Sequence, residues 1–334
     1  MKRLVIFAVL AILLAGCGQQ AVIPETQPET LWETTLPAEP PMVAEVTVAT
    51  EPVVQEAAAL IEPPPPPVSV VLQPEAPGLR ETRCDAAVVD YSNAAQGYIM
   101  VCHPGETSRR LKVLVEGPTT TYKYNLPQGQ WTVFPLSDGD GNYQVGVYRN
   151  TEGSKYVAVM SAKFTVTLED PFAPFLRPNQ YVDYLDAPDT VAMGAALCAG
   201  ITAPLEKVAV IYDYVVKNLY YDTEKAATVK SGYLPVLDTV LEEKKGICFD
   251  YAALMTAMLR SQEVPCKLVV GYAGSVYHAW ISVWTEENGW VDGVIFFDGH
   301  SWKRMDPTFA SSADNQEEIL AFIENGNYTV KYLY

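Results

Sequence analysis

The chain has 334 residues, which is enough for two ordinary domains and additional segments, so a sizeable hydrophobic core is possible. Its formal net charge is −17, which argues against nucleic acid as a partner, because the phosphate backbone is bound by basic surfaces. The sequence gives no sign of a metal or an organic cofactor, and the oligomeric state cannot be read from it.

The first 17 residues have the pattern of an export signal. Lys2 and Arg3 precede an apolar run over residues 4–14, which is too short to span a bilayer as a stable helix. Small residues follow, and Cys17 comes directly after an Ala-Gly pair. We therefore expect residues 1–17 to direct export and to take no part in the fold.

The residues around Cys17 resemble the lipobox of bacterial lipoproteins. The resemblance implies that Cys17 is lipidated and becomes the mature N-terminus. The protein would then be held at the cell membrane by its N-terminal lipid, exposed on the extracytoplasmic side. The alternative is ordinary secretion with an incidental cysteine.

The composition changes sharply from residue 18 to residue 80. Prolines recur, with a continuous run at 63–67, and glutamates are scattered with Arg80 as the one basic residue. Such a segment buries too little apolar surface to offset the entropy of ordering, and its like charges repel one another. We predict a disordered, extended linker over 18–80 that carries a folded unit away from the membrane.

Short β-like runs separated by turn residues follow from 84 to 170. Leu111, Val113 and Val115 show the period of two that is typical of a strand with one buried face. We expect strands at 97–102, 110–116, 121–126, 130–136, 143–149, 156–161 and 163–168. Their regular spacing predicts an all-β sandwich domain over 84–170.

The pattern becomes helical after about residue 181. Apolar residues at helical spacing in the stretch 203–222 predict an amphipathic helix. Further helices are expected at 239–244, from Cys248 onward and at 315–326, and strands at 267–272 and 277–284. Helices followed by antiparallel strands predict an α+β domain over 181–334.

Cys248 lies in the stretch KKGICFDYAALMTAMLRS, between Gly246 and the predicted helix. A thiol at a helix N-terminus is close to the positive end of the helix dipole and to free backbone N–H groups, both of which favour the thiolate. The same N–H groups can stabilise an oxyanion. Alone, however, Cys248 could equally be a small apolar residue at the start of a core helix.

A base for Cys248 has few candidates, because the chain has 3 histidines. His103 precedes a Pro-Gly turn and His300 lies in an Asp-Gly-His loop, whereas His278 lies in the strand-like run YHAWISVW. A regular strand would hold an imidazole at a fixed distance from the helix tip. Downstream, Asp306 in MDPT could orient that imidazole, although an aspartate before proline is often a turn residue.

As an ordered set, GICFDYAALMTAMLRSQEVPCKLVVGY, YHAWISVW and MDPT resemble the transglutaminase-like superfamily, whose core is a papain-like thiol fold. The resemblance is close over 246–308, looser over 181–245, and absent from the linker and the predicted sandwich. It implies an α+β papain-like or transglutaminase-like thiol domain, preceded by an all-β sandwich and a disordered linker.

The resemblance also implies roles for individual residues. Cys248 would attack a carboxamide or peptide carbonyl, His278 would act as base and then acid, and Asp306 would orient His278. A side chain upstream of the cysteine often completes the oxyanion hole in this family, and Tyr221 and Tyr233 are both candidates. The expected partner is a protein or peptide substrate, with cell-wall peptides among the candidates.

Members of this superfamily cross-link, hydrolyse amides, or have lost catalysis and act as binding modules. Because Cys248 and His278 are both present, we predict a thiol acyl-transferase or a cysteine peptidase with a thioester intermediate. The alternative is a catalytically silent surface-binding module on the same scaffold. The other four cysteines, Cys84, Cys102, Cys198 and Cys266, could form up to two disulfides or remain thiols.

Overall fold

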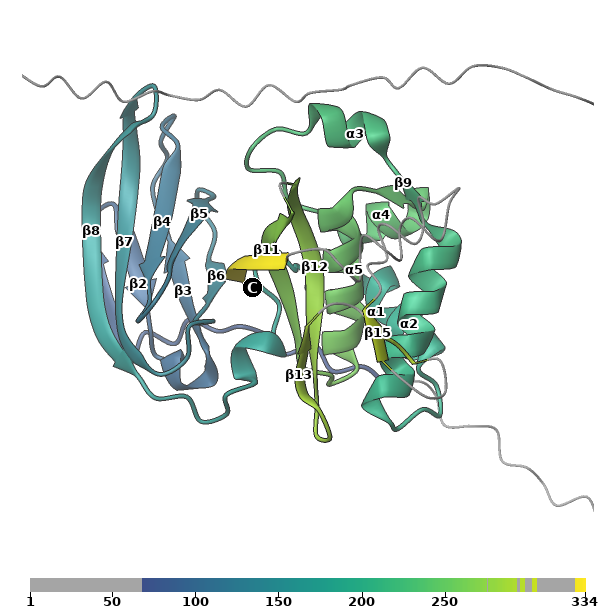
Figure 1. Ribbon diagram of the computed structural model, residues 1–334. Helices are drawn as coiled ribbons and strands as arrows, with labels where there is room; N and C mark the ends of the chain where they lie inside the picture. The colour runs from purple at the N-terminus through teal and green to yellow at the C-terminus, as the bar shows by residue number, and fades with distance from the viewer. Residues whose placement is uncertain (1–67, 275, 293–294, 298–301, 305–327) are drawn as a thin grey trace, which may run out of the picture. The chain divides into compact units, whose positions relative to one another are not determined.

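The computed structural model describes residues 68–274, 276–292, 295–297, 302–304 and 328–334 (Figure 1). The predicted signal peptide with Cys17 and most of the predicted linker lie outside these residues, as do Asp306 and the helix expected at 315–326. Residues from Pro64 to Tyr334 form one compact unit. The predicted domain limits, 84–170 and 181–334, stay predictions. None of the helices in the described ranges has the length and apolar character needed to cross a membrane.

The end of the predicted linker is ordered, which corrects the prediction for residues 68–80. The backbone N–H of Val70 donates to the carbonyl of Ser261 at 2.9 Å. Farther along, the N–H of Glu75 donates to the Tyr98 hydroxyl at 3.1 Å, and that of Gly78 to the Asp90 carboxylate at 2.6 Å. Composition predicted disorder because the segment cannot order itself. Hydrogen-bond acceptors on the rest of the folded unit bind the backbone N–H groups of this segment and order it.

Two four-stranded antiparallel sheets form the β-rich part, as the strand pattern predicted. One has the order β1-β2-β3-β6 and the other β5-β4-β7-β8. The strands are β1 (Glu81–Cys84), β2 (Ala87–Asp90), β3 (Tyr98–Cys102), β4 (Leu111–Glu116), β5 (Thr121–Leu126), β6 (Thr132–Pro135), β7 (Gly141–Glu152) and β8 (Lys155–Val166), with short 3-10 helices at Ala94–Gln96 and Ala173–Phe175. The runs predicted at 156–161 and 163–168 belong to one strand, β8, because inward-facing residues continue to alternate through Ala162.

The α+β part begins with helices. They are α1 (Pro188–Leu197), α2 (Pro204–Asn218), α3 (Thr223–Thr228), α4 (Leu237–Glu243) and α5 (Cys248–Ser261). A four-stranded antiparallel sheet, in the order β13-β12-β11-β16, contains β11 (Cys266–Ala273), β12 (Val276–Thr285), β13 (Gly289–Asp292) and β16 (Tyr328–Leu333). Two small pairs complete it, namely β9 (Tyr220–Tyr221) with β10 (Lys245–Gly246), and β14 (Ile295–Phe297) with β15 (Trp302–Arg304).

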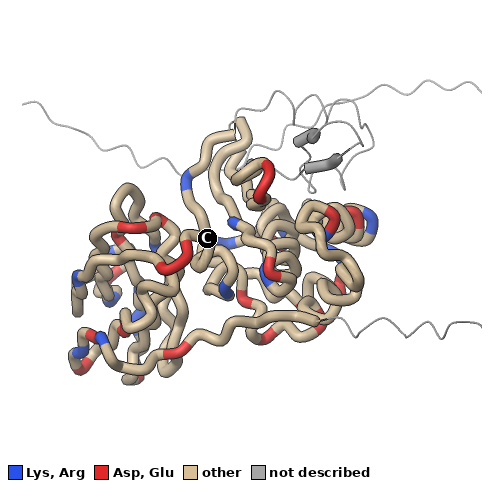
Figure 2. Tube along the Cα trace, turned by 90° about the horizontal axis from the view of Figure 1, so that it is seen from below, with Lys and Arg blue, Asp and Glu red and all other residues tan. Residues whose placement is uncertain are grey.

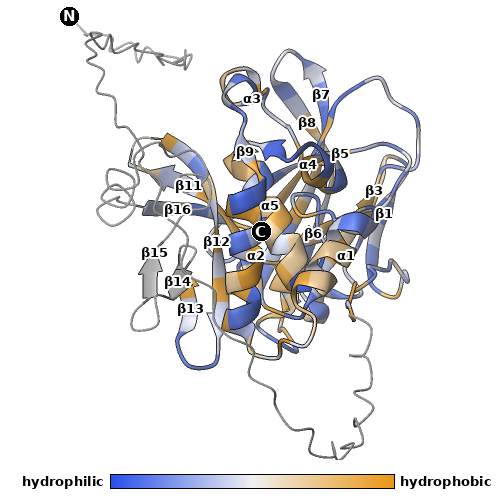
Figure 3. Ribbon diagram, turned by 90° about the vertical axis from the view of Figure 1, so that its right-hand side faces the viewer, coloured by the Kyte–Doolittle hydropathy of each residue, from blue (hydrophilic) through white to orange (hydrophobic). Residues whose placement is uncertain are grey.

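Helix α5 is the core element of this part, since every residue from Asp250 to Ser261 is buried. The surrounding helices have mixed surfaces; α2, for example, carries both hydrophilic and hydrophobic residues (Figure 3). Arg260, in the last turn of α5, is 1% exposed. It donates to the carbonyls of Cys266 at 2.9 Å, Arg177 at 2.6 Å and Tyr334 at 2.6 Å. One buried guanidinium thus holds together α5, the start of β11, the final residue after β16, and the connection that precedes α1.

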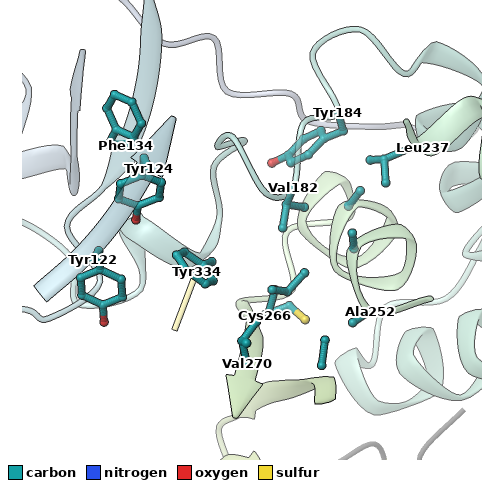
Figure 4. Close-up of a cluster of buried hydrophobic side chains, with 14 of the residues drawn as sticks. Tyr122, Tyr124, Phe134, Val182, Tyr184, Leu237, Ala252, Cys266, Val270 and Tyr334 are labelled. Atoms are coloured by element: carbon teal, nitrogen blue, oxygen red, sulfur yellow. The ribbon is translucent and has the colours of Figure 1, made fainter. Parts of the chain in front are cut away.

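Aromatic rings join the two parts of the compact unit (Figure 4). Tyr334 stacks on Tyr181 with ring centroids 4.1 Å apart. It also meets Tyr122 and Tyr124 of β5 edge-on at 5.7 and 5.8 Å. Tyr181 in turn contacts Phe249, the residue after Cys248, at 5.7 Å. A continuous line of rings therefore connects the β-sandwich to the first turn of α5.

Gly271 of β11 allows β16 to pair closely with it. A Cβ at this position would overlap the carbonyl of Thr329 and lie 2.8 Å from the Trp280 ring. We expect Gly271→Ala to lower the free energy of unfolding by about 1–3 kcal/mol, because the added methyl group forces the strands apart. Urea unfolding would measure this. Gly105→Ala is the matched control, since the nearest atom to its new Cβ is 3.8 Å away; equal losses in both variants would contradict the explanation.

Because thiol and phenol groups are buried in the core, we expect the fold to be less stable at alkaline pH. Burial raises the pKa of the Cys266 thiol to about 11, against about 8.5 in an unfolded chain. Between these values the folded chain keeps a proton that the unfolded chain releases, so the free energy of unfolding falls as pH rises. Buried tyrosines such as Tyr122 and Tyr143, whose pKa burial also raises, act in the same direction. We expect a lower urea midpoint at about pH 10.5 than at about pH 8; equal midpoints would show that these groups are not protected.

Candidate active site

Cys248 is the first residue of α5, and the preceding backbone fixes where it lies. Helix α4 ends at Glu243, and its C-cap, Lys244, has a left-handed φ of 52°. Two residues of β10 follow, and Ile247 is the extended N-cap with φ −100° and ψ 176°. The Cys248 side chain is half-buried. The Cys248 thiol is thus at the positive end of a helix dipole, as the sequence predicted. The backbone N–H of Cys248 belongs to the first turn of the helix, whose N–H groups have no partner within the helix.

Asp250 fixes this turn from within. Its carboxylate has no solvent exposure and accepts from the backbone N–H of Ile247 at 2.8 Å. The Tyr233 hydroxyl donates to the same carboxylate at 2.5 Å, and the Lys225 ammonium at 2.8 Å. Lys225 also donates to the Tyr233 hydroxyl at 2.5 Å. Three side chains from three segments therefore hold the residue before Cys248 in place.

The cluster of Asp250, Tyr233 and Lys225 was not predicted from the sequence. An aspartate two residues after the cysteine is a third-position acidic residue at a helix start, and that signal could have identified Asp250 as a capping residue. Lys225 and Tyr233 are 25 and 17 residues away from Asp250 in the chain. No periodicity links them, so their contact is visible only in the fold.

The two tyrosines considered for the oxyanion hole have different surroundings. The hydroxyl of Tyr233 is engaged by Asp250, and burial, followed by the hydrogen bond and the charge of Asp250, raises the pKa of Tyr233. Tyr221 lies in β9, paired in parallel with Gly246 of β10. The N–H of Asp222 donates to the Gly246 carbonyl at 2.8 Å, which keeps Tyr221 beside the turn that leads to Cys248.

His278 lies in β12, as predicted, and is 5% exposed. Its ring stacks near Trp280 with centroids 6.2 Å apart, so both project from one face of the strand. The neighbouring Tyr277, on the other face, is 55% exposed. Burial raises the pKa of Tyr277 to about 12, with smaller contributions from nearby tyrosines and from Cys248. Strand β12 packs against helix α5. Direct contact between the His278 imidazole and Cys248 Sγ stays a prediction.

The other predicted candidates are placed as follows. His103 is buried after β3, and its Nδ1 is hydrogen-bonded to the carbonyl of Ala86 in the sandwich. Asp306 and His300 lie outside the described residues.

The described cysteines are all free thiols, namely Cys84, Cys102, Cys198, Cys248 and Cys266. Burial raises the pKa of Cys102 and Cys198 as it does that of Cys266. These buried thiols are therefore held protonated.

Charge around the site is mixed. Basic and acidic residues are interspersed along the described chain (Figure 2). Near the first turn of α5, Lys225 pairs with Asp250, and Lys245 pairs with Asp222 at 3.1 Å. Within the described ranges, no cluster of three or more His, Cys, Asp or Glu side chains is arranged to hold a metal ion.

A buried central helix with a cysteine at its start, packed on an antiparallel sheet with a histidine on a neighbouring strand, is the arrangement of an α+β, papain-like fold. Residues 192–293 match the model of the transglutaminase-like superfamily, so this part of the chain is a transglutaminase-like domain. The match includes Cys248, His278, Tyr221 and Tyr233, and it ends before Asp306.

Two curated relatives match a similar region. Uncharacterized protein YebA of Bacillus subtilis is 30% identical over 105 residues, which cover 26% of this chain and 14% of that protein. Protein-glutamine gamma-glutamyltransferase of Pseudomonas aeruginosa is 26% identical over 114 residues, which cover 30% of this chain and 15% of that protein. The chain thus spans about one seventh of the length of these relatives. Among solved structures, a candidate cysteine protease from Cytophaga hutchinsonii aligns over 71% of this chain and 76% of its own, with 18% identity and a TM-score of 0.37.

Proposed function

We propose that the protein is a cysteine acyl-transferase or amide hydrolase in which Cys248, His278 and Asp306 form a catalytic triad. The observation that carries the proposal is the placement of Cys248. Its thiol is half-buried at the first position of a helix that is buried from Asp250 to Ser261, and the Asp250, Tyr233 and Lys225 cluster holds that turn. A core cysteine needs neither partial access nor a fixed N-terminal turn, whereas a nucleophile needs both.

The reaction proceeds in two steps. The Cys248 thiolate attacks a carboxamide or peptide carbonyl, and the imidazolium of His278 gives its proton to the departing ammonia or amine, leaving a thioester. In the second step a primary amine or water attacks the thioester. His278 takes the proton of the attacking group, and the Cys248 thiolate leaves. Asp306 would hold the imidazole in the required tautomer.

The negative charge that develops on the carbonyl oxygen needs donors. The backbone N–H of Cys248 belongs to the first turn of α5 and supplies one. Of the two tyrosines, we propose Tyr221 for the second donor, because its strand pairs with Gly246 immediately before the cysteine. Tyr233 is assigned to positioning instead, because its hydroxyl donates to Asp250.

Incubation of the protein with a glutamine-containing peptide, with hydroxylamine as the acceptor amine, tests the proposal. The products distinguish an acyl-transferase from an amide hydrolase. An acyl-transferase forms a hydroxamate and releases ammonia, whereas an amide hydrolase releases ammonia and leaves a free acid. Cleavage of the peptide backbone would identify a peptidase. If none of these products forms, and wild type and Cys248→Ala bind peptides and cell-wall fragments equally, the silent binding module is the better description.

We also propose that Cys17 is lipidated and anchors the protein on the extracytoplasmic side of the membrane, with residues 18–67 as tether. The basic start, the short apolar run and the Ala-Gly-Cys ending support this. Metabolic labelling with a fatty acid should mark the wild-type protein and leave Cys17→Ser unlabelled. Equal labelling of the two proteins would contradict the anchor.

A further inference from the structure

Asp250 brings a buried negative charge into the same helical turn as Cys248. Its carboxylate has no exposure, and it is the third residue of α5, whereas Cys248 is the first. A carboxylate in this place competes with a thiolate for the positive end of the helix dipole and repels it. The turn can therefore hold a reactive thiolate only if the charge of Asp250 is compensated.

Lys225 is placed to provide that compensation. Its ammonium lies 2.8 Å from Asp250 Oδ2, and the side chain is 27% exposed. The lysine is itself fixed, because its backbone N–H donates to the Asp222 carboxylate at 2.8 Å and its ammonium lies 4.4 Å from the centroid of the Tyr233 ring. A surface lysine is normally free to move. This one is held against a buried carboxylate by three contacts.

The other charged and titratable groups around the turn do not replace it. Lys245 pairs with Asp222, and Glu243 adds negative charge near Tyr233. From β12, Tyr277 is near enough to Cys248 to interact with it electrostatically. Among the described residues, Lys225 is the one cation paired with Asp250.

We propose that Lys225 is a positioning residue for the nucleophile: through its ion pair with Asp250 it keeps the first turn of α5 neutral and ordered, and so keeps Cys248 reactive at neutral pH. The inference rests on the proposed role of Cys248 as nucleophile. Without Lys225, the charge of Asp250 opposes the thiolate, and alkylation of Cys248 requires a higher pH. Removing both charges should restore the original profile.

The test is the pH profile of Cys248 alkylation by iodoacetamide, followed by peptide mass spectrometry of the full-length protein. We expect Lys225→Met to lower the rate near neutral pH by about tenfold, which corresponds to a shift of about one pH unit. Lys225→Arg, which keeps the charge, and Lys225→Met with Asp250→Asn should both return the profile toward that of the wild type. Lys245→Met is the matched control, because it removes a neighbouring lysine that pairs with Asp222 instead.

Thermal unfolding checks that each variant is folded. If Lys225→Met does not fold, Lys225→Gln, which retains a hydrogen-bond donor, replaces it in the alkylation experiment. An unchanged profile in Lys225→Met, or in Lys225→Gln where that variant replaces it, would overturn the inference, as would a shift of equal size in Lys225→Met and in the double variant. Failure of the proposed function looks different: wild-type Cys248 would react no faster than Cys84, a half-buried thiol of the sandwich. That result removes the nucleophile and the inference together.

Discussion

Cys248→Ala is expected to lower the rate of amide turnover by a factor on the order of 10⁴ or more, because it removes the atom that forms the thioester. His278→Ala should cost nearly as much, since a thiol without its acid and base cannot expel the leaving group. The measurement is release of ammonia from a glutamine peptide under saturating and limiting substrate.

The double variant distinguishes a catalytic unit from two independent residues. Groups that act together are not additive, so Cys248→Ala with His278→Ala should be about as slow as either single variant. Cys84→Ala is the matched control, since Cys84 is a half-buried free thiol of the sandwich, and it should retain full activity. Substantial turnover by His278→Ala would contradict the role given to this histidine.

Arg260→Met should cause the largest loss of stability, about 3–5 kcal/mol. The guanidinium is 1% exposed and donates to three carbonyls, those of Cys266, Arg177 and Tyr334. Methionine fills a similar volume but leaves these carbonyls without their charged donor in a buried site. Urea unfolding followed by tryptophan fluorescence gives the change in the free energy of unfolding.

The control for this effect is another arginine in a different environment. Arg83 pairs with Glu81 at 2.9 Å on the surface, with its side chain 60% exposed. Arg83→Met should change the free energy of unfolding by less than about 1 kcal/mol, because exposed ion pairs contribute little. If the two variants lost equal stability, the buried carbonyl contacts of Arg260 would not be the reason for its presence.

Local patterns predicted the elements that position Cys248. The glycine turn, the apolar helix and the alternating strand each depend on neighbours within a few residues, and these appear as α5, β11 and β12. The ordered set of Cys248, His278 and Asp306 indicated the family, and the match over 192–293 confirms it for that region.

Contacts between distant residues were not predictable in the same way. Arg260 reads as an ordinary basic residue at a helix end, yet its three acceptors come from distant segments. Residues 68–80 were predicted to be disordered because composition reports what a segment can do alone. Tyr233 was a candidate for the oxyanion hole because only its place in the chain was known, and the hydrogen bond from its hydroxyl to Asp250 could not be predicted from that place.

Trapping the acyl-enzyme tests the central claim most directly. The protein is incubated with a glutamine peptide without added amine and quenched in acid, and the peptide that contains Cys248 is analysed by mass spectrometry. We predict a mass increase equal to the donor minus ammonia on Cys248, which is removed by hydroxylamine and absent from Cys248→Ala. Turnover of the donor with no adduct on Cys248, or an adduct that forms equally on Cys84, would contradict the account.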